Sequence, residues 1–205
     1  MDSSVVLLLC CLVTLSCQCN VVRRMIAKLM KHPAKRYERY NACLESRLMV
    51  NTNPHNLAVN DKNCNVQLRA VDWEIEPTVR WPLAKADEVY TLMMGNPNEY
   101  YEEGEYYVHW LLVNIWGSDL IEGKVNRGVT VLDYQGPSEP TGGNVQLYQV
   151  LVYRQQSEIF YFDKVYEYER KWFRLDLWFK LQPWTQFFGP EAGIQFTIDY
   201  DIVNC

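Results

Sequence analysis

Histidine is scarce in this sequence, and its scarcity limits the catalysis that the chain can perform. Of the three histidines, His32 and His55 lie in the N-terminal part, whereas His109 lies within an almost wholly apolar run. A Ser/His/Asp set would have to use His109, yet no serine stands in a Gly-x-Ser-x-Gly context. The sequence also lacks a phosphate-binding P-loop and a His-Glu-x-x-His pair. We therefore predict a protein that is not an enzyme, with no metal site and no cofactor.

The net charge bears on the class of partner. The chain has 20 Lys and Arg against 25 Asp and Glu, a balance of −5, whereas nucleic-acid binding requires a basic face. A basic run from Arg23 to Arg39 is typical of a solvated helix face, with contact to nucleic acid or lipid headgroups as the minority interpretation. We predict no nucleic-acid partner.

The first residues resemble a secretory signal in composition. Val5–Leu15 is almost wholly apolar and is followed by small residues up to Cys19, which is typical of a cleaved signal peptide. The run is shorter than the roughly 20 apolar residues that span a bilayer. We predict a signal peptide over 1–19, secretion, and no stable membrane span. Arg23 and Arg24 follow the run and leave a signal-anchored form open, and a mitochondrial address is a further alternative.

The cysteines indicate at least one disulfide. Cys43, Cys64 and Cys205 lie in the body of the chain, and Cys19 joins them if cleavage spares it. Four cysteines allow two disulfides, with the pairing left open, whereas three leave one cysteine free or paired between chains. None of the spacings resembles a zinc site.

Apolar periodicity divides the chain into a helical N-terminal part and a strand-rich body. Val21–Leu48 has helical spacing interrupted by Pro33, which predicts two short helices, and Asn51–Asn65 has the composition of a loop. The period of Asp163–Leu181 fits helix and strand equally. The predicted strands are Val66–Ala70, Thr78–Trp81, Glu88–Met94, Tyr106–Ile115, Val145–Arg154 and Ile194–Val203.

Five segments, taken in order, resemble the phosphatidylethanolamine-binding protein (PEBP) family. They are Thr78–Asn98 (two strands and a loop with Asn96-Pro97-Asn98 at the family's Asp-Pro-Asp), Tyr107–Gly117 (the His-x-Leu-x-x-Asn strand), Asp133–Gly142 (the Gly/Pro loop), Gln146–Gln155 (the His-Arg-Tyr strand) and Pro190–Asp201 (the closing Pro-x-Ala-Gly-x-x-Phe segment). The segment Tyr107–Gly117 is also similar to the PEBP-like protein of the mitochondrial large ribosomal subunit.

The resemblance implies a mainly β fold, an antiparallel β-sandwich of Greek-key type with short N-terminal and peripheral helices. The expected organisation is a signal peptide over 1–19, a helical extension and loop over 20–60, and a PEBP-like domain over 61–205. In relatives a C-terminal helix borders the pocket, and we expect that helix to be missing because Cys205 follows the closing strand so soon.

The resemblance also implies a small pocket for a phosphate or carboxylate group. Such an anion requires hydrogen-bond donors, and the matching positions offer the imidazole of His109, the phenol of Tyr148 and the turn at Gly136. Asn96 and Gln146 replace a pocket aspartate and a second histidine of the relatives. The expected ligand-binding set is therefore His109, Asn96, Gly136, Gln146 and Tyr148, in a pocket more neutral than those of its relatives.

Two functional hypotheses of different classes follow. The first is a non-enzymatic binding protein that takes a small anionic ligand or a phospholipid headgroup at His109. The second is a protein-interaction or modulator module, including a mitochondrial ribosomal role, whose pocket has decayed. In the second hypothesis His109 is a core residue, which is the commoner place for a lone histidine in an apolar strand.

Overall fold

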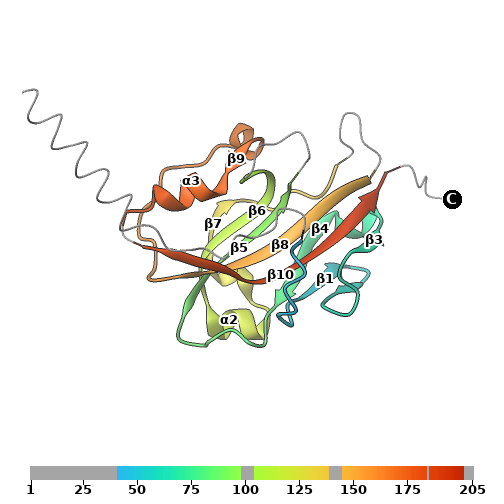
Figure 1. Ribbon diagram of the computed structural model, residues 1–205, viewed down its shortest axis with the longest axis horizontal. Coiled ribbons are helices and arrows are strands. Elements are labelled where there is room, and N and C mark those ends of the chain that lie inside the picture. Colours follow the sequence, from blue (N-terminus) through green and yellow to red (C-terminus); the bar gives the residue numbers. More distant parts are fainter. Residues whose placement is uncertain (1–40, 98–103, 139–144, 184, 201–205) are drawn as a thin grey trace, which may run out of the picture. The chain divides into compact units, whose positions relative to one another are not determined.

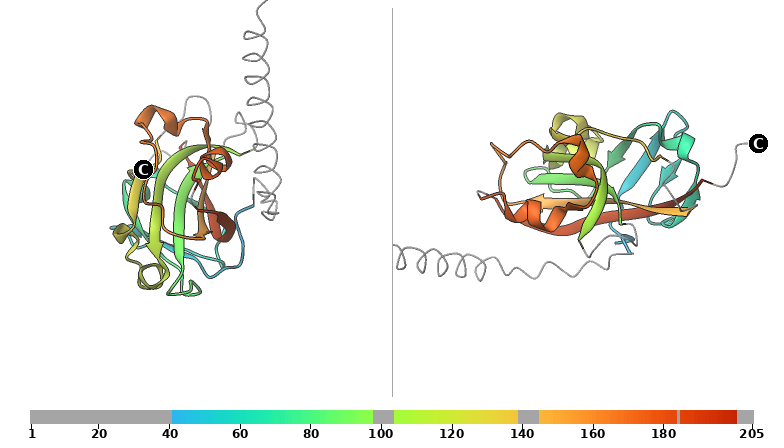
Figure 2. Two further views of the ribbon diagram at one scale, coloured as in Figure 1. Left: turned by 90° about the vertical axis from the view of Figure 1, so that its left-hand side faces the viewer. Right: turned by 90° about the horizontal axis from the view of Figure 1, so that it is seen from above.

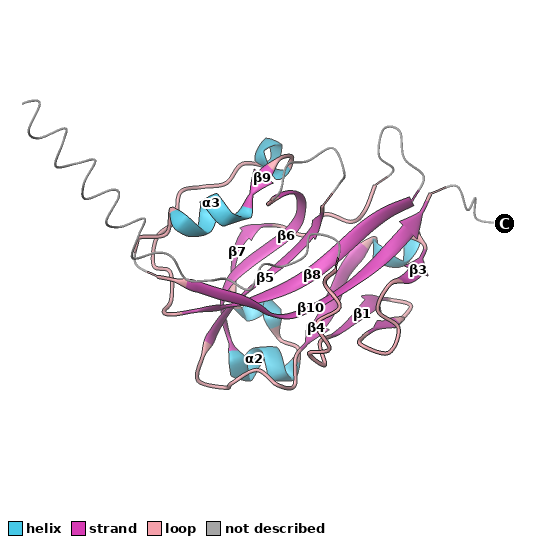
Figure 3. Cartoon of the chain, viewed as in Figure 1, coloured by secondary structure: helices cyan, strands magenta, loops and turns pink. Residues whose placement is uncertain are grey.

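Strands are the predominant regular structure in the part of the chain that the computed structural model describes, which is residues 41–97, 104–138, 145–183 and 185–200 (Figures 1 and 3). The larger of two sheets has seven strands. In spatial order they are β3 (Val66–Leu68), β10 (Phe187–Asp199), β8 (Val145–Gln155), β5 (Val89–Asn96), β6 (Glu105–Trp116) and β7 (Val129–Leu132), with β9 (Phe173–Arg174) also paired to β6. The predicted mainly β fold is confirmed.

β5 lies inside this sheet and is apolar on both of its faces. All eight of its residues are buried. Successive side chains of a strand point to opposite faces, and accordingly Leu92 and Met94 belong to one hydrophobic cluster while Met93 belongs to another. A strand that is buried at every position therefore requires a cover on each side of the sheet.

A second, smaller sheet covers one face. Its strands lie in the order β2 (Ala58–Val59), β1 (Met49–Asn53) and β4 (Ile75–Arg80). Val50 and Val79 are fully buried in the same cluster as Leu92 and Met94. The two sheets thus form a sandwich around one core, and Figure 2 shows them from two further sides.

The other face of the large sheet is covered by the segment that follows β8. Ile159, Phe173 and the residues Leu175 and Trp178 of α3 (Leu175–Lys180) pack in the cluster that contains Met93. This segment is a succession of short pieces, with η3 (Glu167–Arg170), β9 and α3 joined by loops. That succession explains why Asp163–Leu181 has no single period. The remaining short helices are η1 (Ala70–Trp73), α2 (Gly117–Glu122) and η2 (Val125–Arg127).

Residues 41–59 differ from the sequence expectation. No helix is present over residues 41–48, and the predicted loop contains β1 and β2. β1 alternates burial along its five residues, and the sequence pattern is obscured because Asn51, Thr52 and Asn53 fill positions that apolar residues usually hold. The remainder of the predicted helical part, residues 21–40, lies outside the described residues. A second difference is that β3 pairs with β10 in parallel.

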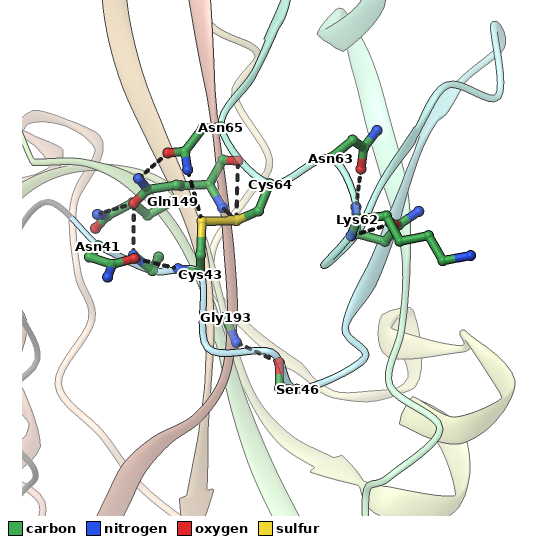
Figure 4. The surroundings of a disulfide bond; sticks show 12 residues. Asn41, Cys43, Ser46, Lys62, Asn63, Cys64, Asn65, Gln149 and Gly193 are labelled. Carbon is green, nitrogen blue, oxygen red and sulfur yellow. Dashed lines mark hydrogen bonds between the residues drawn. A yellow bond between two sulfur atoms is a disulfide. The ribbon is translucent and has the colours of Figure 1, made fainter.

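A disulfide joins the start of the described chain to the loop before β3. Cys43 and Cys64 are bonded, at a sequence separation of 21. Amide side chains surround the bond, among them Asn65, which is labelled in Figure 4. Asn65 Nδ2 lies 3.3 Å from Cys43 Sγ. The side chain of Gln195 in β10 accepts a hydrogen bond from the Ala42 backbone N–H at 2.7 Å. The disulfide and the amides together attach residues 41–48 to the large sheet. Cys19 and Cys205 lie outside the described residues.

We expect the double variant Cys43→Ala/Cys64→Ala to unfold with a free energy about 3 kcal/mol lower than the parent, because the closed loop restricts the unfolded chain. Urea unfolding followed by tryptophan fluorescence measures this change. Reduction of the parent should reproduce the loss and should leave the double variant unaffected. Equal stability of the two chains under oxidising conditions would contradict the prediction.

Candidate functional site

Three adjacent strands bring the predicted side chains to one place. In the ladder β8–β5–β6, Gly95 of β5 is opposite Gln149 on one side and Val108 on the other. Tyr148, Asn96 and His109 stand next to these three residues, so the sheet register alone gathers them. The rings of His109 and Tyr148 meet edge to face, with 5.2 Å between centroids.

His109 is tied to the loop that follows β7. Its Nδ1 lies 2.9 Å from the carbonyl oxygen of Gln135, and its own carbonyl accepts the Gln135 N–H at 2.8 Å. Because a carbonyl only accepts, Nδ1 carries the hydrogen, and the neutral ring presents Nε2 as an acceptor. The ring of Tyr107 lies on another side, 4.9 Å away.

Burial keeps this imidazole neutral. Only 4% of His109 is exposed, and desolvation, with a smaller contribution from the charge of Arg170, lowers its pKa to about 4 against the opposing effect of the Gln135 and Gly136 backbone. At neutral pH the ring is therefore uncharged, and its one N–H is used on the Gln135 carbonyl.

The two amides that replace the family's charged groups bond to each other. Asn96 Nδ2 donates to Gln146 Oε1 at 3.0 Å. The Asn96 Oδ1 atom is buried and has no hydrogen-bond partner among the described residues. Such an atom is costly to leave unpaired. It therefore marks a position where a donor from a ligand or a water molecule would be stabilised.

Tyr148 contributes a phenol that stays protonated. Its hydroxyl lies 2.7 Å from that of Tyr200. Burial first, and then the neighbouring Tyr200, raise the pKa of Tyr148 far above its ordinary value, although the Asn96 amide opposes the shift. Tyr148 also stacks on Phe196, which in turn stacks on Trp73 with 3.9 Å between ring centroids.

Gly136 is the position where the loop approaches η1. A Cβ placed there would lie 2.7 Å from the carbonyl oxygen of Trp73, which also accepts the hydroxyl of Tyr134 at 2.6 Å. The absence of a side chain thus lets residues 133–138 lie against η1 and beside His109. Two other residues of the matched loops, Asn98 and Glu139, lie outside the described residues.

Sequence reasoning missed Arg170, which fixes the strand that carries His109. Its guanidinium is 2% exposed and donates to the carbonyls of Val108, His109 and Asp133 at 2.7–3.1 Å. Glu167 supplies its counter-charge. The arginine lies in the segment without a clear period, so no sequence signal distinguishes it from a surface cation.

Asn114, the last polar residue of the matched His-x-Leu-x-x-Asn strand, has a structural role. Its amide donates to the Ile159 carbonyl at 2.8 Å and accepts the Ile159 N–H at 2.9 Å. This paired contact holds the segment after β8 against β6. The described residues contain no group of three or more His, Cys, Asp or Glu side chains placed to hold a metal ion.

The lowered pKa of His109 makes stability depend on pH with a definite sign. Between pH 6.5 and about 4 the unfolded chain binds a proton at this ring and the folded chain does not, so the free energy of unfolding falls as the pH falls. The loss attributable to this ring is about 3 kcal/mol and is complete below pH 4. His109→Asn keeps a donor near the Nδ1 position and removes the titration. Urea titrations at several pH values should show the two chains converging in stability as the pH drops; parallel profiles would contradict the assignment.

Comparison with known proteins supports the fold directly. No family model matches the chain. A Drosophila melanogaster protein whose name proposes odorant binding (odorant-binding protein A5) is 30% identical over 97 residues, which are 46% of this chain and 43% of that protein. The matched part of this chain thus spans less than half the length of that relative.

Two solved structures share the architecture. Carboxypeptidase Y inhibitor, determined in complex with its cognate proteinase, superposes with a TM-score of 0.54 at 15% identity, covering 74% of this chain and 82% of that one. The phosphatidylethanolamine-binding protein of Plasmodium vivax superposes with a TM-score of 0.51 at 15% identity, covering 74% and 84%. The resemblance to the phosphatidylethanolamine-binding proteins is confirmed, since this chain has their fold in a divergent form, whereas the resemblance to the mitochondrial ribosomal protein stays a prediction.

Proposed function

We propose that this chain is a non-enzymatic binding protein that takes a small anionic ligand or a phospholipid headgroup at the cluster formed by Asn96, His109, Gly136, Gln146 and Tyr148. The observation that carries the proposal is the convergence of the His109 ring, the Tyr148 ring and the Gln135–Gly136 backbone at one end of the strands. Names of two neighbours in fold, a phosphatidylethanolamine-binding protein and a proteinase inhibitor, support a binding or inhibitory role rather than catalysis.

The polarity of the cluster favours a ligand that carries both donors and acceptors. The hydroxyl of Tyr148 and the Asn96 amide are neutral donors for phosphate oxygens. The buried Asn96 Oδ1 and the neutral His109 ring are acceptors, and an ammonium group is the donor that suits them. A phosphoethanolamine headgroup supplies both kinds of group, so it should bind more tightly than inorganic phosphate.

The contacts of His109 are consistent with a binding role. Its ring meets Gln135, Tyr107 and Tyr148. None of these three is a serine, a cysteine or a carboxylate. His109 therefore does not act with any of them as the general base of a nucleophile. A ring with a pKa near 4 is also a weak base at neutral pH.

A protein-interaction role is the second candidate, and the proteinase complex of one neighbour in fold is the finding that favours it. In that case the His109 cluster is a remnant that only stabilises the sheet ends. The ribosomal variant of this role stays a prediction. Binding measurements at the cluster separate the two candidates.

We expect phosphoethanolamine to shift the NMR signals of the His109 ring, and Tyr148→Phe to weaken its binding about tenfold, because one hydrogen bond to a charged group is lost. Calorimetry of phosphoethanolamine, phosphate and ethanolamine measures the affinities. Tyr90→Phe, at the other end of β5, is the matched control and should bind as the parent does. If none of the three probes binds, or both variants weaken binding equally, the binding function fails and the interaction role takes its place.

We also propose that the chain is secreted, with a signal peptide over residues 1–19. The disulfide supports an oxidising compartment, and among the described residues no helix is long and apolar enough to cross a membrane. Expression with a C-terminal tag in cultured cells should give a chain in the medium that starts at or near Asn20 by mass spectrometry. Retention of the full chain in the membrane or mitochondrial fraction would contradict secretion and favour the anchored or mitochondrial alternatives.

A further inference from the structure

A groove runs beside β7 on the part of the molecule formed by β6, β7 and the segment after β8. Its volume is about 590 Å³. One wall is β7 and the residue after it, represented by Thr130, Val131 and Asp133, and the other wall is Phe162–Tyr168. We call it the β7 groove. It has no residue in common with the His109 cluster, so its function is independent of the ligand proposed there.

β7 is the last strand of its sheet. Its partner is β6, to which Val129, Thr130 and Leu132 are paired. On its outer side no backbone hydrogen bond joins it to another segment in the described part of the chain. The outward N–H and C=O groups of such an edge strand pair readily with an added strand, and the groove lies on this free edge.

The opposite wall is held in place before any partner arrives. Arg170 donates to the carbonyls of Val108 and Asp133, and thereby fixes η3 against β6 and the end of β7. Glu169 accepts the backbone N–H of Tyr166 at 2.6 Å, which caps the same turn. A preformed wall lowers the ordering cost of binding.

The groove combines exposed aromatic rings with an unpaired carboxylate. Tyr168 is 77% exposed and stacks on Tyr166, with 5.5 Å between the ring centroids. Tyrosine is one of the residues enriched at protein–protein interfaces. The Asp133 carboxylate has no cationic partner within the described residues. Glu76 lies close enough to Asp133 for their charges to interact. Lys164 is the one cation among the described residues that line the groove; it lies on the opposite wall, with its Nζ 5.2 Å from the centre of the Tyr166 ring. The nearby guanidinium of Arg170 is already paired with Glu167. The Asp133 end of the groove therefore favours a basic side chain.

We propose that the β7 groove binds an extended peptide segment of a partner protein, which adds as a strand to β7 and carries basic side chains between apolar ones. Backbone pairing with β7 supplies the register, the Tyr166–Tyr168 wall receives an apolar side chain, and Asp133 receives a lysine or arginine. About four residues of the peptide match the length of β7.

The test uses the full chain and a fluorescein-labelled octapeptide that alternates lysine with valine. Fluorescence anisotropy should show saturable binding that weakens with salt. N-methylation of alternate peptide nitrogens keeps the side chains but removes backbone pairing, and should weaken binding about tenfold or more. A glutamate-for-lysine octapeptide should not bind measurably.

Two exposed tyrosines give a matched pair of protein variants. Tyr168→Ala removes a side chain that lines the groove, whereas Tyr161→Ala removes one of similar exposure, 74%, that does not. We expect Tyr168→Ala to weaken octapeptide binding about tenfold, Tyr161→Ala to leave it unchanged, and both variants to keep the parent's melting temperature. Asp133→Asn should reduce the dependence on salt.

Results of three kinds would overturn the proposal. The first is equal binding of the methylated and unmethylated octapeptides, which would exclude strand addition. The second is an equal effect of the two tyrosine substitutions, or no binding at all. The third is sedimentation of the parent as a dimer that Tyr168→Ala converts to a monomer, which would assign the groove to a second copy of this chain.

Discussion

Burial of the large sheet on both faces is the constraint on which the rest of the structure depends. All residues of β5 are buried. The small sheet covers one of its faces, and the segment after β8 covers the other. Each cover is then attached by polar contacts at its edge. On one side these are the Cys43–Cys64 disulfide and its amides, and on the other they are Asn114 and Arg170.

The candidate binding site and the β7 groove both lie at the borders of the large sheet, where it is next to the loop after β7 or to the segment after β8. The His109 cluster lies where β5, β6 and β8 reach the same end of the sheet, beside the loop after β7. The groove lies where the cover after β8 runs beside the edge of the sheet. Arg170 bonds to carbonyls of Val108, His109 and Asp133 and so stands between the two regions.

Replacement of charged groups by amides defines the divergence of this chain. Where the family resemblance implies a carboxylate and a second imidazole, Asn96 and Gln146 bond to each other instead. A carboxylate would have held a protonated His109, and without one the buried ring is neutral. Asn96 and Gln146 thus occupy the positions of the family motifs, but they form neutral hydrogen bonds where the resemblance implies charged groups.

The sequence by itself determined five strands of the large sheet, because buried strands require uninterrupted or alternating apolar residues whatever surrounds them, as in Tyr106–Ile115 and Val145–Arg154. It did not predict β7 and β9, which have four and two residues and are too short to show a period. It also placed His109, Gly136 and Tyr148 on elements that the fold resemblance brings together. It could not find β1, whose asparagines pair through the backbone of β4, nor the role of Arg170, whose partners are distant carbonyls. Only the tertiary structure decided the state of His109, since burial and the Gln135 carbonyl set its proton, and both depend on residues far along the chain.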